Sequence, residues 1–332
     1  MLCSANDVRK LWEKVPGEEA INVYINIPFC MCQCRYCMYK GQTNVSADSR
    51  SKFVRNYLVP NIFQFKQEIL AHKIDTIYFG GGTPNTISIE DFLYIRNTLK
   101  ELFDSATNIV IEVNPAFVKA DYLERLCREM KPTLISFGVQ SFDKESLAFQ
   151  KRPYCSPEKL KDLILICKEH KVYTSIDLMC YLKNYSRKDF TIFEKDYELA
   201  QQMELDFFTV YPELNLVLKQ PEAKTDFAKF VNKLPLSKDY YTDSIDYKDL
   251  EEHVITHARG IFRVINKKHS FEYFLTNVLA YYEDDFPLAS QNIIGFGDNK
   301  CNQHIVSYSP KRFFYIEKNM GGIPTFDQKY PC

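Results

Sequence analysis

The chain lacks several features that would place it at a membrane or on a nucleic acid. No apolar run approaches the roughly 20 residues that a membrane span requires. Asp7, Arg9 and Lys10 interrupt the N-terminal apolar residues where a signal peptide would keep them together. The formal net charge is −1, whereas a broad nucleic-acid-binding face needs clustered positive charge. We therefore expect a cytoplasmic protein with neither a membrane nor a nucleic acid as its partner.

Glycine is also scarce, whereas cysteine is abundant. The 332 residues include 11 glycines and 11 cysteines. Without a secretory signal, many cysteines indicate a reducing compartment and a metal or redox role rather than disulfides. The length suits one large domain, or one domain with an extension.

Three cysteines follow the first predicted strand closely. The apolar run 21–27 reads as a buried strand that ends at Pro28. Cys30, Cys34 and Cys37 follow with the spacing C-x3-C-x2-C. Cysteine thiolates are the usual ligands of 4Fe–4S clusters. Three thiolates on one loop would hold three irons and leave the fourth open to another ligand.

A zinc site is the alternative interpretation of this loop. Zinc sites usually have a fourth Cys or His at matching spacing. Cys32 could serve, although four sulfurs within eight residues would be crowded. We assign Cys32 no role.

Strands and helices alternate through the first two-thirds of the chain. The pattern predicts six strands, at 21–27, 76–79, 108–113, 134–139, 173–179 and 206–211. It predicts helices at about 4–14, 52–73, 88–103, 119–130, 156–171 and 188–203, with Pro60 dividing the second. Ser88 with Asp91, and Ser156 with Pro157, are helix-start signals. Alternation at this spacing implies parallel strands, in an open doubly wound sheet or a barrel.

The unusual motifs follow the ends of these strands, where barrels of parallel strands carry their chemistry. The clearest is Gly80-Gly81-Gly82-Thr83-Pro84 after the second strand. Three glycines remove three side chains, so a ligand can approach the backbone closely.

Taken together, these motifs resemble a known family. Tyr36 completes the pattern C-x3-C-x-aromatic-C of the radical S-adenosylmethionine (radical SAM) superfamily. Four stretches in order, 24–30, 78–85, 111–115 and 136–143, are similar to the oxygen-independent coproporphyrinogen III oxidase-like branch, which includes the haem chaperone HemW. The resemblance covers about residues 20–212.

The resemblance implies a fold, cofactors and site residues. We expect an α/β protein with a partial (β/α)6 radical SAM barrel over 1–212 and a C-terminal extension, a substrate-side or cap region, over 213–332. The cofactors would be a 4Fe–4S cluster on Cys30, Cys34 and Cys37 and one or two SAM molecules. The residues expected at the SAM site are Tyr36, Gly80, Gly81, Gly82, Thr83, Glu112, Gln140, Arg152 and Asp177. Arg152 could instead be a surface cation, and Asp177 an ordinary strand-end residue.

The resemblance also implies a reaction. A flavodoxin- or ferredoxin-like donor would reduce the cluster, and SAM would be cleaved to methionine and a 5′-deoxyadenosyl radical that abstracts hydrogen. Three departures concern the substrate side: Asn26 replaces a usual His, Leu134 a usual Arg, and 181–184 a Gly-Leu-Pro-Gly stretch. We therefore favour modification of a small metabolite or natural product, with methyl or methylene transfer as one form. Rival interpretations are a tetrapyrrole enzyme, a non-catalytic haem chaperone and a structural zinc protein.

The pattern is weaker beyond residue 212. It predicts helices near 224–233, 248–267 and 270–286. The segment 293–299 resembles a glycine stretch that lines a ligand site in the family, but is equally an ordinary turn. His253 and His257 could share a helix face as a packed or solvated pair.

Overall fold

A computed structural model of the chain describes residues 15–37, 41–182 and 189–213 without a break, residues 9, 10 and 13, and most of 216–235. Later parts are described as separate strands, given below, together with the N-terminal pair 2–3. The predictions for 270–286, His253 and His257 lie outside the described residues. Among the described helices, none has the length and apolar character needed to cross a membrane.

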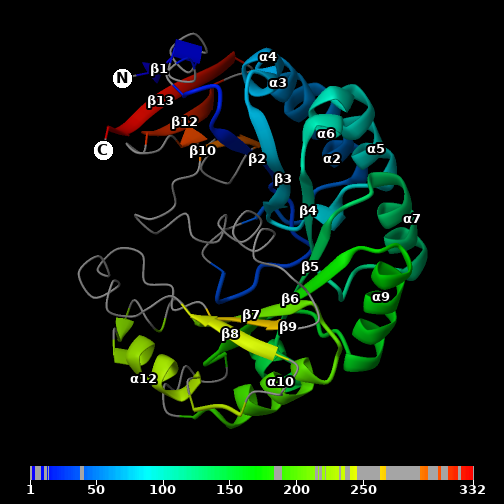
Figure 1. The fold of residues 1–332 in the computed structure, drawn as a ribbon, viewed down its shortest axis with the longest axis vertical. Helices are drawn as coiled ribbons and strands as arrows, with labels where there is room; N and C mark the ends of the chain where they lie inside the picture. The colour runs from blue at the N-terminus through cyan, green and yellow to red at the C-terminus, as the bar shows by residue number, and fades with distance from the viewer. Residues whose placement is uncertain are drawn as a thin grey trace.

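The centre of the molecule is a curved parallel sheet (Figure 1). Six strands pair in chain order, β2 (Ala20–Ile27), β3 (Lys73–Gly81), β4 (Asn108–Val113), β5 (Leu134–Gln140), β6 (Tyr173–Cys180) and β7 (Phe207–Pro212). All six predicted strands are thus confirmed. The ten-stranded sheet ends in a different strand at each edge, so it is open, as a partial barrel requires.

Four strands after residue 212 extend this sheet. β10 (Asn292–Gly297) lies parallel to β2, and β11 (Val306–Ser307) is antiparallel to β10. At the other edge β9 (Phe262–Asn266) is antiparallel to β7 and to β8 (Tyr240–Ser244). The predicted helix 248–267 is therefore wrong at 262–266, where aromatic and β-branched residues favour a strand beside β7. The boundary at 212 stays a prediction.

A second, three-stranded sheet is formed by the two ends of the chain. β1 (Leu2–Cys3) pairs with β13 (Ile323–Pro331), which also pairs with β12 (Phe313–Met320). Figure 1 shows this sheet beside β10.

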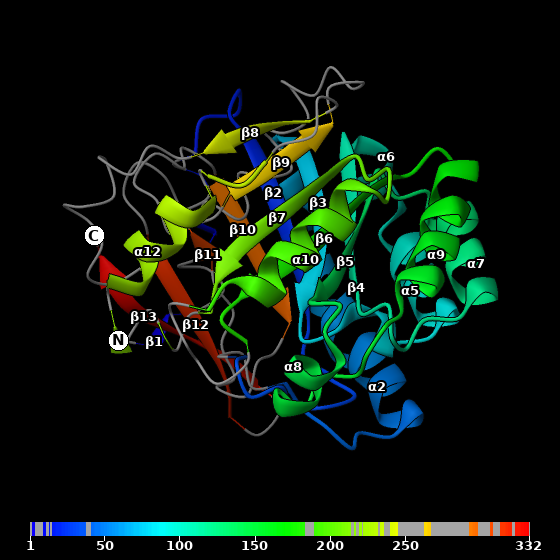
Figure 2. The same cartoon turned by 90° about the horizontal axis from the view of Figure 1, so that it is seen from below.

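Helices cover the outer, convex side of the curved sheet (Figure 1). The described helices are α2 (Ala47–Phe53), α3 (Val59–Phe63), α4 (Lys66–Leu70), α5 (Ile89–Thr98), α6 (Lys100–Ser105), α7 (Ala120–Met130), α8 (Lys144–Phe149), α9 (Pro157–Glu169), α10 (Thr191–Gln201) and α12 (Glu222–Val231). A π-helical turn, Val54–Leu58, joins α2 to α3 without a break, so the backbone stays helical through Pro60 and the helix is not divided there. The division comes at Phe65, before α4. Figure 2 shows α2 and α8, which follow β2 and β5, at one end of the sheet.

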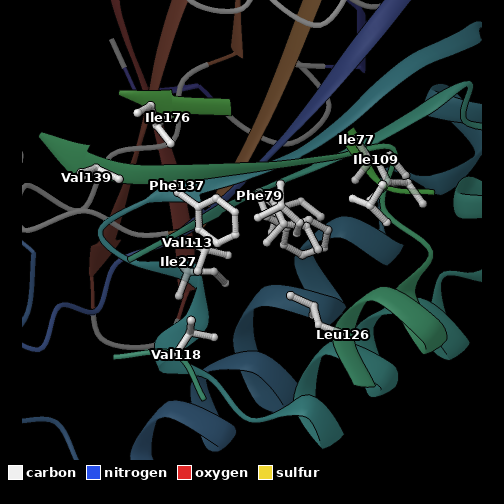
Figure 3. Close-up of a cluster of buried hydrophobic side chains, with 14 of the residues drawn as sticks. Ile27, Ile77, Phe79, Ile109, Val113, Val118, Leu126, Phe137, Val139 and Ile176 are labelled. Carbon is white, nitrogen blue, oxygen red and sulfur yellow. The ribbon is translucent and has the colours of Figure 1, made fainter. Parts of the chain in front are cut away.

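Side-chain alternation gives the sheet two different faces. The outer face packs apolar residues against the helices in one large core. Figure 3 labels part of it: Ile27, Ile77, Phe79, Ile109, Val113, Val118, Leu126, Phe137, Val139 and Ile176. The inner face carries half-buried residues that include Tyr24, Asn26, Glu112, Asp177 and Tyr211. Functional side chains are therefore confined to the concave face and to the strand ends.

A prediction follows from the start of α9. The Ser156 hydroxyl accepts a hydrogen bond from the Lys159 backbone N–H at 3.2 Å, and Pro157 is the first helical residue. Ser156→Ala is expected to lower the free energy of unfolding by about 1 kcal/mol, because the N–H loses its acceptor. The midpoint of urea unfolding would measure it, with the exposed Lys161→Ala on the same helix as the neutral control. Equal midpoints for both variants would contradict the cap.

Candidate radical SAM site

The cysteine loop is fixed at both ends. At its start, the backbone N–H of Cys30 donates to the Gln42 carbonyl at 2.9 Å, and the N–H of Gln42 donates to the Pro28 carbonyl at 2.7 Å. Further on, the N–H of Arg35 donates to the Gln150 carbonyl at 2.9 Å. Gln150 directly follows α8, so the loop is attached to the segment after β5 as well as to β2.

The three cysteines suit a cluster better than a single metal ion. Cys30, Cys34 and Cys37 are free thiols, Cys34 buried and the others half-buried. Among the described residues, no three Cys, His, Asp or Glu side chains are grouped to hold one ion. Each thiolate of a 4Fe–4S cluster binds a different iron, so such ligands need not converge on one point. The donor set therefore fits the predicted cluster.

The glycines at the end of β3 form a close-fitting cradle beside this loop. The Gly82 N–H donates to the Ile27 carbonyl at 2.8 Å. A Cβ on Gly82 would lie 2.6 Å from the Phe29 carbonyl oxygen and 3.0 Å from Cys30 Sγ. Gly81 has a φ of +105°, which other residues rarely adopt. The next residue, Thr83, places its hydroxyl 3.8 Å from Cys30 Sγ. The glycines thus allow two strand ends to meet where the sulfurs are.

Arg152 lies against the other side of the loop. Its Nη1 donates to the Tyr36 hydroxyl at 2.7 Å and to Cys34 Sγ at 3.7 Å. Cys32 Sγ is 3.9 Å from Cys34 Sγ. The hydrogen bond from Cys32, aided by the charge of Arg152, lowers the pKa of Cys34 despite its burial. Cys34 is therefore favoured as the thiolate that a metal needs.

Two carboxyl groups lie on the concave face, Glu112 on β4 and Asp177 on β6, with β5 between them. The Tyr78 hydroxyl donates to Glu112 Oε1 at 2.6 Å. Burial nevertheless raises the pKa of Glu112 to about 7. Burial, followed by the charge of Glu112, raises the pKa of Asp177 to about 8, although Arg152 opposes the shift. Asp177 Oδ1 is buried and has no hydrogen-bond partner among the described residues. It is suited to accept from a ligand hydroxyl or amine.

Gln140, at the end of β5, has a strained backbone. Its φ is +73°, a conformation that is uncommon outside glycine and concentrated at functional sites. Its Oε1 accepts from the Tyr211 hydroxyl at 2.6 Å. That bond fixes the side-chain orientation and identifies Nε2 as the donor end.

The structure brings the predicted residues to the carboxyl ends of β2–β6, although their roles stay predictions. Arg152 contacts Tyr36 and Cys34 directly, and Thr83 contacts Cys30. Sequence reasoning missed Tyr24, Tyr78 and Tyr211, which lie on the concave face beside predicted residues. A Cβ on Gly80 would lie 2.9 Å from the rings of both Tyr24 and Tyr78. The alternation of side chains along each strand could have found them, because it places every second residue on the same face as a predicted site residue.

One departure from the family lies far from this site. Leu134 is the first residue of β5 and is 1% exposed, at the opposite end of the strand from Gln140. Its replacement of a usual arginine therefore carries no information about a ligand beside the cysteines. Asn26, in contrast, lies on the concave face, and its side chain packs against Gly81. A Cβ on Gly81 would lie 1.9 Å from Asn26 Oδ1.

A parallel open barrel with three cysteines and a glycine cradle at its strand ends defines a radical SAM protein. The family model of the radical SAM superfamily matches residues 24–195. The chain belongs to this superfamily, whose members use a 4Fe–4S cluster and SAM, and it falls in the branch of HemN and HemW.

Three similar proteins illustrate the branch. The haem chaperone HemW of Haemophilus influenzae is 29% identical over 67% of this chain and 56% of its own length. The oxygen-independent coproporphyrinogen III oxidase of Synechocystis is 31% identical over 38% of this chain and 27% of its own. The structure of Escherichia coli coproporphyrinogen III oxidase, HemN, has a TM-score of 0.67 over 95% of this chain and 71% of that one. At 16% identity this last likeness shows the shared fold alone. The match spans about half of the length of HemW and about a quarter of the length of the Synechocystis oxidase.

The raised pKa values of the Glu112 and Asp177 carboxyls predict that the stability of the fold depends on pH. In the unfolded chain both carboxyls ionise near pH 4. Between about pH 4 and 8 the folded protein therefore binds more protons, and its stability falls as pH rises. Urea unfolding from pH 5 to 8 should show a steeper fall for the wild type than for the double variant Glu112→Gln, Asp177→Asn. Parallel curves would show that these carboxyls do not titrate as described.

Proposed function

We propose that the chain is a radical SAM enzyme that abstracts hydrogen from a small metabolite or natural product. Methyl or methylene transfer is one form that the modification could take. One observation carries the proposal: the thiols of Cys30, Cys34 and Cys37 share a loop, and Gly82, the last glycine of the cradle, lies against the start of that loop. That arrangement supports a cluster with SAM beside it.

The chain's own residues would then act by binding and orientation. Cys30, Cys34 and Cys37 would hold the cluster, and Gly80, Gly81, Gly82 and Thr83 would offer backbone groups to SAM. Glu112 and Asp177 would accept hydrogen bonds from ligand hydroxyls. When bound and reduced, the cluster supplies the electron that cleaves SAM into methionine and a 5′-deoxyadenosyl group. The protein contributes positioning and exclusion of water.

Two features of the concave face support the SAM site that the resemblance implies. Asp177 Oδ1 offers a buried acceptor, and Gln140 offers a donor held in place by Tyr211. Asn26 supplies an uncharged amide where the family usually has a titratable His. A flavodoxin- or ferredoxin-like protein would be the electron donor.

Tetrapyrrole chemistry is the second candidate, and the names of the relatives favour it. Both similar sequences act in haem metabolism by their names. The position of Leu134 removes one argument against this candidate, because that residue lies away from the site. A non-catalytic haem chaperone would belong to the same candidate.

The test is anaerobic reconstitution with iron and sulfide, followed by reduction and addition of SAM. Formation of 5′-deoxyadenosine supports the proposal, and S-adenosylhomocysteine alongside it indicates methyl transfer. A parallel haem titration separates the candidates. Stoichiometric haem binding without SAM turnover would replace the proposed enzyme with a chaperone.

A further inference from the structure

The guanidinium of Arg152 is held between the cysteine loop and β5. Besides its bonds to Cys34 Sγ and the Tyr36 hydroxyl, its Nη2 donates to the Gly138 carbonyl. Its Cζ lies 6.0 Å from the centre of the Tyr36 ring. One strand, β5, and the cysteine loop thus fix the group in one place, which is expected to lower the entropic cost of its hydrogen bonds.

The residues around Arg152 provide room for this placement. Gly138 faces the concave side of β5, and a Cβ there would lie 2.9 Å from Nη2. Arginine stays protonated over the accessible pH range, and this guanidinium contacts Cys34 Sγ and the Tyr36 hydroxyl directly. A permanent positive charge therefore lies beside one of the three cluster cysteines.

We propose that Arg152 is a positioning residue that sets the reduction potential of the cluster through its hydrogen bond to Cys34 Sγ. The inference rests on the proposed function, because it requires the cluster. Reduction adds negative charge to the cluster and its thiolates. A buried cation that donates to a ligand sulfur stabilises the reduced state, and hydrogen bonds to sulfur are known determinants of cluster potential. Arg152 therefore makes reduction easier.

This role differs from the SAM contact that the family resemblance implies. The Nη1 bonds to Cys34 and Tyr36 and the Nη2 bond to Gly138 are made with protein atoms, so they do not require SAM. The effect of Arg152 on the potential must therefore be present before SAM binds. A purely SAM-binding arginine would leave the potential of the SAM-free cluster unchanged.

The chain offers a matched control in Arg35, a second arginine close to Cys34, which it follows directly in the sequence. Arg35 is exposed, and its Cζ lies 5.0 Å from the centre of the Phe149 ring. Solvent and salt screen its charge from the cluster. Arg35→Gln thus removes a positive charge from the same loop without removing a hydrogen bond to sulfur.

The experiment is a redox titration of the reconstituted full-length protein without SAM, followed by electron paramagnetic resonance. Arg152→Gln is expected to shift the midpoint potential of the cluster to more negative values. Arg152→Lys keeps the positive charge but loses the planar guanidinium with its several donors, so it is expected to shift the potential less. Arg35→Gln should match the wild type.

An unchanged potential in Arg152→Gln with a full cluster would overturn the inference, as would an equal shift in Arg35→Gln. If Arg152→Gln does not retain the cluster, the lysine variant decides by the same criterion: a negative shift supports the inference and an unchanged potential overturns it. Failure of the wild type to bind a cluster would remove the proposed function and this inference together. An unchanged potential removes the inference alone.

Discussion

Cys34→Ala is expected to eliminate 5′-deoxyadenosine formation. Cys34 is the buried member of the three predicted ligands, and two thiolates cannot hold three irons. Loss of a group that merely supports a metal ligand typically costs 10–100-fold, so loss of the ligand itself should exceed about 100-fold. Iron content and deoxyadenosine, measured on the same reconstituted sample, would show both losses.

Cys32→Ala is the matched control for this prediction. Cys32 lies on the same loop, 3.9 Å from Cys34 by their sulfurs, but outside the C-x3-C-x2-C spacing. Its replacement should retain the cluster and product formation. If the two variants behaved alike, with both losing the cluster, Cys32 would have to be a ligand, and the predicted set of three would be wrong.

Gly82→Ala is expected to disrupt the site from the opposite side. The added Cβ would meet the Phe29 carbonyl oxygen at 2.6 Å and Cys30 Sγ at 3.0 Å. A backbone carbonyl cannot rotate away as a flexible side chain can, so the end of β3 and the cysteine loop must separate. Overpacking of this kind costs about 1–3 kcal/mol. We expect a lower urea midpoint and a strongly reduced cluster content.

Gly17→Ala provides the comparison for that variant. A Cβ on Gly17 would meet only the Ala71 carbonyl oxygen, at an ordinary 3.8 Å. It should therefore leave the cluster content and the urea midpoint close to those of the wild type. A Gly82→Ala protein with normal iron content would show that the cradle and the loop do not contact as described.

The strands were predictable because local pattern and burial agree in them. The run 108–113 is rich in β-branched apolar residues, and it forms β4 over the same residues. The short helix α8 was not predicted, because six residues give too little periodicity. The strand at 262–266 was missed because its pairing partner, β7, lies some fifty residues earlier in the chain. The aromatic and β-branched residues of 262–266 are the local signal for a strand there, and the pairing itself adds none.

The site residues likewise divide into those that the sequence predicts and those that only the structure shows. Motif spacing found the cysteines, the glycines, Glu112 and Arg152. It could not show that Arg152 reaches a cysteine sulfur, because the two residues are 118 positions apart. The tyrosines on the concave face were missed, since an aromatic residue in an apolar strand resembles core. Only the structure, which assigns each residue to the concave or the outer face of the sheet, distinguishes these tyrosines from core residues.

The pairing of β10 with β2 has a consequence for synthesis. Ile21 lies opposite Asn292 in this pair, and ribosomes add about 5–20 residues per second. The strand that precedes the cysteines therefore waits roughly 15–50 s for its neighbour. During that interval its edge exposes unpaired N–H and C=O groups to any other nascent chain. A chain stopped before residue 292 would keep every predicted cluster and SAM ligand, yet leave β2, the strand that leads into the cysteines, open to aggregation.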